Sequence, residues 1–521
     1  MKYFILIISF TGLTILSYSQ TKKQSDQQLG NAYYPAEFPE EKTRLASLML
    51  TLPAVDKIFQ DFAKENHLPS IAYGIVADGK VIYSGATGII NLKNKTKATT
   101  QSLFRIASMT KSFTAMAIMK LQEDGKLSIT DPASKYVSEM EGFKYLTVDA
   151  APITIFNLLT MTAGFPEDNP WGDRQLEDTA GEFLDFLRGG VSFSSAPGQQ
   201  FEYSNLGFAI LGLVVTRVSG MPYQQYITKN ILQPLGMNNT YWEFSEINPH
   251  QLVIGYRWED QQWKEEPMLH DGAYGAMGGL ITSIEDFSKY VAFHLSAYPH
   301  RNEKEQGPVK RNSVREMHKP QMPFLFTDSK RADGTLCPVV SGYGFGLGYR
   351  MDCEGIVRIS HGGGLPGFGS DYRFYPDMGI GVISFANRTY AGTGRVDGRV
   401  LDTLMLAGGL KPRMLPASAI LNTRKDQLIP ILLSWDEKQA NAIFAENFFL
   451  DLSRSAWEKK SKEVFDNVGK IVSTGSLVPE NQLRGYFMLN GEKGKVRIYF
   501  TLSPEKDPKI QQLDLNFEPA Q

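Results

Sequence analysis

The feature that most constrains this sequence is an apolar helix that begins near a serine. The run Phe104–Lys111 leads directly into Ser112–Met119, and Gly125 follows where a glycine commonly ends a helix. Apolar residues lie nearly all the way round this helix, which indicates that it is buried. Ser108 and Lys111 are three residues apart, so their side chains lie next to each other on one helical face. The fold must therefore bury this segment and hold both side chains at its start.

This Ser-x-x-Lys pair has two interpretations. Burial and the positive end of the helix dipole both lower the pKa of Lys111, and a neutral amine can take the proton of Ser108 and activate it as a nucleophile. Alternatively, Ser108 is an ordinary helix N-cap and Lys111 is solvated. The same spacing occurs at Ser19–Lys22 and Ser503–Lys506, but neither pair opens an apolar helix. Context therefore selects Ser108, while the motif alone leaves both interpretations open.

The first 19 residues have the pattern of a secretory signal peptide. Lys2 supplies the positive start, Tyr3–Leu16 the apolar stretch, and Ser17-Tyr18-Ser19 a small-x-small cleavage site. An uncleaved membrane anchor is the alternative, but the apolar run is shorter than the roughly 20 residues that a span needs. The sequence therefore predicts a secreted or periplasmic protein without a stable membrane span after processing.

Composition excludes several functional classes. A net charge of −2 offers no electrostatic attraction to nucleic acid, so no such partner is expected. The seven histidines show no metal-binding spacing, and no C-x-x-C occurs, so we expect no metal and no other cofactor. The two cysteines, Cys337 and Cys353, either form a disulfide or remain two thiols, and both interpretations stay open.

A chain of 521 residues is too long for one core, so two or three domains are expected. The strand-like runs Ile71–Val76 and Lys80–Gly85 are joined by Asp78-Gly79, which predicts a hairpin. Late in the chain, Lys495–Leu502 alternates apolar and polar residues as a half-buried strand does. The predicted organisation is a signal peptide at 1–19, a polar lead-in at 20–52, a main domain at 53–410, a linker at 411–416 and a small α+β domain at 417–521.

Two further segments carry polar residues at places where side chains can enter a cleft. Tyr203 and Asn205 lie on a loop just before an apolar helix predicted from Leu206 to Gly220. His361-Gly362-Gly363-Gly364 follows a strand-like run at Ile356–Ser360, with no G-K-[ST] of a phosphate loop. The glycines favour a strand edge that a substrate approaches closely, and a plain flexible turn is the alternative.

The order and spacing of the three segments resemble the penicillin-recognising serine hydrolases. This family includes class C β-lactamases, D-alanyl-D-alanine carboxypeptidases, D-aminopeptidases and related esterases. The segments Leu158–Pro166 and Pro234–Met237 are also similar to that family, and the resemblance covers roughly Pro53 to Leu410. It implies an α/β (α+β) β-lactamase/transpeptidase-like fold, in which an antiparallel sheet is flanked by helices and joined to a mainly helical subdomain. The small α+β domain would follow as an accessory.

The resemblance also implies roles for individual residues. Ser108 would form the acyl-enzyme, Lys111 would accept its proton, and Tyr203 would protonate the leaving group and later activate water. Asn205 would bind the substrate amide and orient Lys111. The backbone N–H groups of Ser108 and Gly364 would form the oxyanion hole.

The third motif departs from the family pattern. Many β-lactamases have Lys-Thr-Gly where this chain has His361-Gly362-Gly363, which are expected to bind substrate. Histidine, with an ordinary pKa near 6.5, is mostly neutral at neutral pH, so β-lactam hydrolysis should be weak or absent. We expect an exported serine hydrolase acting on esters, amides or D-amino-acid peptides, with small molecules and short cell-wall peptides as candidate substrates. The alternatives are a β-lactamase proper and a non-catalytic sensor or binding protein of the penicillin-binding type.

Overall fold

The structure is a computed structural model of the 521-residue chain, and it describes residues 33–39, 41–330 and 334–520. The predicted signal peptide at 1–19 lies outside the described residues. The chain forms two compact units. One is Ala36–Met414, and the other contains Leu415 onward together with the described residues up to Pro35.

A nine-stranded sheet forms the centre of the first unit, and every strand pair in it is antiparallel. Its strands, in spatial order, are β3 (Thr96–Lys97), β2 (Lys80–Asn91), β1 (Ser70–Ala77), β14 (Ile380–Ala386), β13 (Phe368–Tyr375), β12 (Val357–Leu365), β11 (Gly348–Met351), β10 (Val339–Tyr343) and β9 (Met322–Thr327). All residues of β1 and β14 are buried, as expected for strands covered on both faces. The predicted β1–β2 hairpin is confirmed, with Asp78 and Gly79 both at positive φ.

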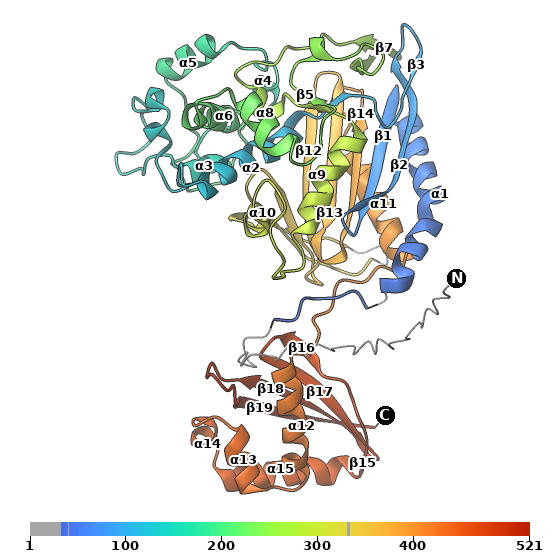
Figure 1. The fold of residues 1–521 in the computed structure, drawn as a ribbon, viewed down its shortest axis with the longest axis vertical. Helices are drawn as coiled ribbons and strands as arrows, with labels where there is room; N and C mark the ends of the chain where they lie inside the picture. The colour runs from blue at the N-terminus through green and yellow to red at the C-terminus, as the bar shows by residue number, and fades with distance from the viewer. Residues whose placement is uncertain (1–32, 40, 331–333, 521) are drawn as a thin grey trace, which may run out of the picture. The chain divides into compact units, whose positions relative to one another are not determined.

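Helices cover both faces of this sheet (Figure 1). On one face, α1 (Glu41–Glu65) and α11 (Gly394–Ala407) enclose a core that includes Phe59, Val382 and Leu401. On the other face, α9 (Ile284–Ser296) packs against β1, β2 and β14. The predicted fold class is confirmed by this arrangement of an antiparallel sheet between helical layers.

The first helix begins earlier than expected. The lead-in prediction for residues 20–52 is wrong from Glu41 onward, because α1 starts there and passes through Pro53. A proline inside a helix costs about 3 kcal/mol. Leu48 and Leu52 are both buried. Burial of a leucine side chain stabilises the folded state by about 1.5–3 kcal/mol, so the two together offset that cost.

The helical part of the first unit lies at one end of the sheet (Figure 1). Its helices are α2 (Thr110–Glu123), α3 (Ile155–Leu159), α4 (Asn169–Gly172), α5 (Ala180–Gly189), α6 (Asn205–Ser219), α7 (Tyr223–Ile227) and α8 (Gly275–Gly278). Gly125 and Gly220 have positive φ just beyond α2 and α6, so both predicted glycine stops are confirmed. Among the described helices, none alone is long and apolar enough to cross a membrane. Taken together across a bend of 76°, α6 and the segment Tyr223–Leu232 reach that length and apolar content, by length and composition only.

Short elements connect the helical part to the sheet. They are β4 (Phe104–Arg105), β5 (Thr240–Tyr241) and β8 (Ile281–Thr282), which pair together, and the hairpin of β6 (Tyr256–Glu259) with β7 (Gln262–Glu265). The pairing of β4 with β8 brings the chain to the start of α2. A disulfide joins Cys337, just before β10, to Cys353, just after β11.

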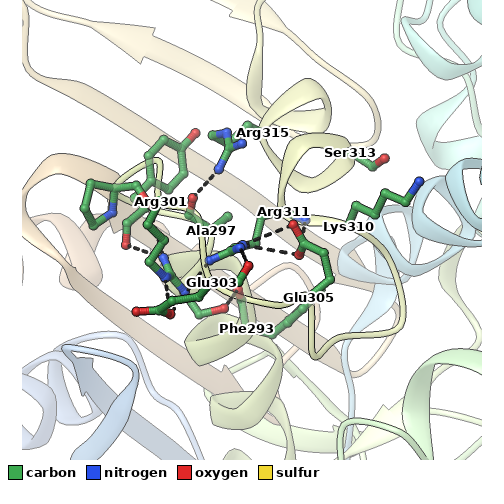
Figure 2. Close-up of polar contacts among 12 residues, drawn as sticks. Phe293, Ala297, Arg301, Glu303, Glu305, Lys310, Arg311, Ser313 and Arg315 are labelled. Atoms are coloured by element: carbon green, nitrogen blue, oxygen red, sulfur yellow. Dashed lines mark hydrogen bonds and ion pairs between the residues drawn. The ribbon is translucent and has the colours of Figure 1, made fainter. Parts of the chain in front are cut away.

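Ion pairs hold the connection between α9 and α10 (Arg311–His318), as Figure 2 shows. Arg311 donates from Nε to both carboxylate oxygens of Glu305 at 3.2 Å and from its guanidinium to the backbone oxygen of Glu303. Arg315 donates to the backbone oxygen of Ala297 at 2.6 Å. These contacts tie the connection to both helices.

The second unit is an α+β module with its own core. A five-stranded antiparallel sheet contains β15 (Ile471–Thr474), β16 (Val478–Asn481), β17 (Arg484–Gly491), β18 (Gly494–Leu502) and β19 (Ile510–Pro519). Its helices are α12 (Ala419–Leu433), α13 (Glu437–Ile443), α14 (Phe448–Asp451) and α15 (Arg454–Val468). The predicted alternation in β18 is confirmed, because Val496, Ile498 and Phe500 are all buried. Sequence patterns did not identify α12, which contains Pro430.

Candidate active site

Ser108 lies in a tight turn at the start of the buried helix α2. Ala107–Met109 form a 3₁₀ turn, and the α-helix proper begins at Thr110. Ala107 has a φ of 49°, a strained value for a residue other than glycine, and such strain is common at functional sites. Neither the 3₁₀ turn nor α2 has a side-chain N-cap. The interpretation of Ser108 as an ordinary N-cap is therefore wrong.

Lys111 is completely buried, so it is not a solvated lysine. Its Nζ lies 2.9 Å from Ser108 Oγ, 2.7 Å from Asn205 Oδ1 and 2.9 Å from the Met277 backbone oxygen. Because a lysine ammonium has three N–H donors, it donates to all three atoms. A neutral amine keeps two of these bonds and accepts the third from the Ser108 hydroxyl. This geometry suits transfer of the serine proton to the lysine.

The protonation of Lys111 is set by opposing effects. Burial lowers its pKa to about 7, while the charges of Asp173 and Asp168 act in the other direction. Desolvation is the larger effect here. A substantial fraction of Lys111 is therefore neutral at physiological pH, as a general base requires.

Tyr203 lies beside Ser108 and Lys111. Lys111 Nζ is 5.0 Å from the centre of its ring. Burial raises the pKa of Tyr203, and the interaction of its phenol with Ser108 lowers it by a smaller amount. The phenol therefore keeps its proton at neutral pH and can donate it to a leaving group.

The start of α6 is held by a carboxylate that sequence reasoning missed. Asp168 accepts hydrogen bonds from the backbone N–H groups of Asn205 at 2.6 Å and Leu206 at 2.9 Å. Ser204 caps the helix by accepting from the Gly207 N–H at 3.1 Å. These bonds fix Asn205 against Lys111. Asp168 lies 37 residues before Asn205, and no local pattern links the two.

The His361–Gly364 segment is part of strand β12, with one open edge. It pairs with β13 on one side, whereas β11 pairs only with the earlier part of β12, Val357–Ser360. A Cβ on Gly363 would clash with the Ile106 backbone oxygen, next to the nucleophile turn. A Cβ on Gly364 would meet Tyr390 Cδ1 at 2.6 Å. Gly363 and Gly364 are thus required for close approach, and the flexible-turn interpretation is wrong because the segment is a strand.

His361 is neutral across the physiological range. Its Nδ1 donates to the Gly362 backbone oxygen at 2.6 Å, so Nε2 accepts from the Tyr343 hydroxyl at 3.0 Å. Burial, with a further contribution from the charge of Lys111, lowers the pKa of His361 to about 4. The expectation of an ordinary histidine titrating near 6.5 is therefore wrong.

These residues share one cavity of about 450 Å³. Its lining contains the predicted residues Ser108, Tyr203, His361, Gly362, Gly363 and Gly364. It also contains residues that the sequence did not suggest, namely Asn169, Pro170, Asp173, Tyr390 and Gly392. Lys111 and Asn205 are completely buried and are not part of this lining; Lys111 contacts Ser108, and Asn205 contacts Lys111. Among the described residues, no group of three or more His, Cys, Asp or Glu side chains is placed to hold a metal ion.

The family model for beta-lactamase matches residues 55–405. The chain belongs to the beta-lactamase family. Members of this family are normally serine hydrolases, and the matched range contains every residue of the cavity lining.

Relatives of this beta-lactamase family member were found among curated proteins. Protein flp of Staphylococcus aureus (strain MW2) is 30% identical over 345 residues, which are 64% of this chain and 62% of that protein. Beta-lactamase-like protein 2 of Dictyostelium discoideum is 28% identical over 47% of this chain and 46% of that protein. The chain thus spans only about half to three fifths of the length of these relatives.

Solved structures share the fold. A penicillin-binding protein homologue from Pyrococcus abyssi, described as octameric, has a TM-score of 0.56 and 23% identity, covering 90% of this chain and 98% of that chain. A class C beta-lactamase has a TM-score of 0.54 and 20% identity, covering 67% of this chain and 95% of that chain. At these identities the likeness shows the fold alone.

Proposed function

We propose that this chain is an exported serine hydrolase that forms an acyl-enzyme at Ser108. Its substrates are esters, amides or D-amino-acid peptides, and its β-lactam hydrolysis is weak or absent. The observation that carries the proposal is the 2.9 Å contact between Lys111 Nζ and Ser108 Oγ, made by a lysine without solvent exposure. Export rests on the signal-peptide pattern of residues 1–19 alone.

Acylation begins with a proton transfer. Neutral Lys111 takes the proton of the Ser108 hydroxyl as Oγ attacks the substrate carbonyl, and the carbonyl oxygen becomes an oxyanion. The backbone N–H groups of Ser108 and Gly364 are the proposed donors to that oxyanion. The lowered pKa of Lys111 supports this step, because an ordinary lysine would be protonated at neutral pH.

Tyr203 is the proposed carrier of the second proton. Its phenol donates to the leaving oxygen or nitrogen as the tetrahedral intermediate collapses, and Lys111 returns a proton to the phenolate. In deacylation water gives a proton to the Tyr203 phenol as that phenol passes its own proton to neutral Lys111. The hydroxide attacks the acyl carbonyl, and Ser108 leaves with the proton that Lys111 now holds. Tyr203 lines the same cavity as Ser108, and Lys111 Nζ lies 5.0 Å from the centre of its ring, which supports this role.

The strand edge and the neutral histidine set the proposed substrate preference. An extended substrate would lie along the open edge of β12 beside Gly362 and Gly363. Neutral His361 offers no charge to a substrate carboxylate, so neutral esters and amides are favoured over β-lactams.

A covalent probe tests the proposal. The purified protein should react with a fluorophosphonate to give one adduct at Ser108, located by mass spectrometry of peptides, and Ser108→Ala should abolish it. Steady release of p-nitrophenol from a p-nitrophenyl ester then separates an enzyme from a sensor that acylates only once. Labelling that survives Ser108→Ala, or a single stoichiometric burst without turnover, would contradict the proposal.

A further inference from the structure

The cavity beside Ser108 has an acidic side chain to which no role has yet been assigned. Asp173 follows helix α4 directly and lines the cavity. Among the described lining residues, Asp173 is the one carboxylate, and no lysine or arginine side chain lines the same space. A substrate in this cavity therefore meets a negative charge at Asp173.

The two carboxylate oxygens of Asp173 have different environments. Oδ2 accepts a hydrogen bond from the Tyr390 hydroxyl at 2.9 Å. Oδ1 is buried and has no hydrogen-bond partner among the described residues. The whole residue is only 2% exposed. Buried carboxylate oxygens are normally paired, because an unpaired one loses hydration without compensation.

We propose that Asp173 Oδ1 binds a positively charged N–H donor of the substrate, so that the preferred substrate carries a primary ammonium group. This inference rests on the proposed hydrolase activity and adds the substrate class. A charged N–H donor would complete the hydrogen bonding of Oδ1 and pair its charge in a site partly closed to water. Tyr390 acts as the positioning residue, because its hydroxyl holds Oδ2.

The charge of Asp173 is coupled to the charges of its neighbours, above all to that of Lys111. The charged and titratable groups acting on it are Lys111, Asp168, Arg174 and the Tyr390 phenol. Burial raises the pKa of Asp173, and the charge of Lys111 lowers it. A change at Asp173 will therefore also alter the base strength of Lys111. That indirect effect acts equally on any two substrates that differ only in charge, so it cancels in their ratio.

Paired substrates isolate the direct contact. One pair places the charge in the acyl group, β-alanyl against butyryl p-nitrophenyl ester, where an ammonium replaces a methyl group. The second places it in the leaving group, 3-(aminomethyl)phenyl acetate against 3-ethylphenyl acetate. For each pair the measured quantity is the ratio of kcat/KM for the charged and neutral members.

In at least one pair we expect this ratio to fall about tenfold to a hundredfold in Asp173→Asn, the usual contribution of a charge-assisted hydrogen bond. The asparagine keeps an oxygen for the Tyr390 hydroxyl. Asp185→Asn removes the same charge from an exposed position on α5 and should leave both ratios as they are. Ratios that are equal in wild type and Asp173→Asn for both pairs would overturn the inference.

A binding measurement separates this inference from the proposed function. In Ser108→Ala, which cannot form an acyl-enzyme, calorimetry with benzylammonium and benzyl alcohol reports cation binding without turnover. Benzylammonium should bind about tenfold or more weakly after the additional Asp173→Asn change, whereas benzyl alcohol should not. A protein that hydrolyses no ester but shows this difference would refute the hydrolase and keep the cation site. Equal benzylammonium binding with and without Asp173 would overturn the site.

Discussion

Lys111 Nζ lies 2.7 Å from Asn205 Oδ1, although the two residues are 94 positions apart. The bond joins the start of α2 to the start of α6 inside the protein, and it directs the amine toward Ser108. Asn205 is itself completely buried. The position of the base is therefore decided by the packing of two helices, and the following predictions depend on it.

Lys111→Ala should slow acylation of Ser108 by roughly two to four decades, because it removes the general base. The rate is read from the time course of fluorophosphonate labelling. Lys120→Ala on the same helix is the control, since Lys120 pairs with Asp124 and does not line the cavity. A Lys111→Ala protein that labels as fast as Lys120→Ala would show that Lys111 is not the base.

The acylation rate should rise with pH through about 7 and then level off. Burial lowers the pKa of Lys111 to about 7, and only the neutral amine can accept the serine proton. Tyr203 does not titrate in this range, because burial raises its pKa above the ordinary value near 10. Burst kinetics with a neutral ester between pH 5.5 and 9 measure the profile. A rate that falls as pH rises through 7 would contradict the assignment.

The preference between a cephalosporin and a neutral ester should depend on pH between 5 and 8 in the same way in the wild type and in His361→Gln. Burial holds the pKa of His361 at about 4, so the histidine stays neutral over this range. His361→Lys should raise cephalosporin acylation relative to ester acylation by up to about tenfold. This is the lower end of the effect expected from a charge-assisted hydrogen bond, because burial also disfavours the charged form of a lysine. His361→Gln, which stays neutral, is the matched control. Burial also raises the pKa of Asp173 in the same cavity to about 6, so only a pH dependence present in the wild type and absent from His361→Gln would indicate a titrating His361.

Gly363→Ala should lower stability by about 1–3 kcal/mol, the usual cost of overpacking, because its Cβ would clash with the Ile106 backbone oxygen. Thermal unfolding measures the change. Gly362→Ala is the neighbouring comparison, since the nearest atom to its Cβ is Asp371 Oδ2 at 3.5 Å, an ordinary contact. Equal melting temperatures for the two variants would mean that Gly363 does not need to be a glycine.

A chain ending at Met414 should keep esterase activity. The first unit, Ala36–Met414, contains the whole cavity lining, and the second has its own hydrophobic core. The measurement is kcat/KM for a p-nitrophenyl ester with the shortened and full-length proteins. A shortened protein that folds and is labelled at Ser108 but does not turn over would contradict this prediction.

The parts of the fold that sequence patterns predicted well are those with local signals. The all-round apolar pattern of α2, its glycine stop at Gly125 and the Asp78-Gly79 hairpin were all correct, because each depends on neighbouring residues. The start of α1 was not, because tertiary contacts stabilise its first turns before Pro53: Leu48 is buried in the core shared with α11, and Arg44 pairs with Asp78. Helix α12 was missed since its internal Pro430 weakens the helical signal.

The sequence by itself placed Ser108 next to Lys111, because three residues of helix bring two side chains together without help from the rest of the chain. It also supplied Tyr203, Asn205 and the glycines of β12. Only the tertiary structure decided how these groups behave. The pKa values of Lys111 and His361 are lowered mainly by burial, and Asp173 faces the same cavity from 65 residues along the chain from Ser108. Desolvation and long-range contact depend on what the folded chain packs around a residue, and no local spacing records that.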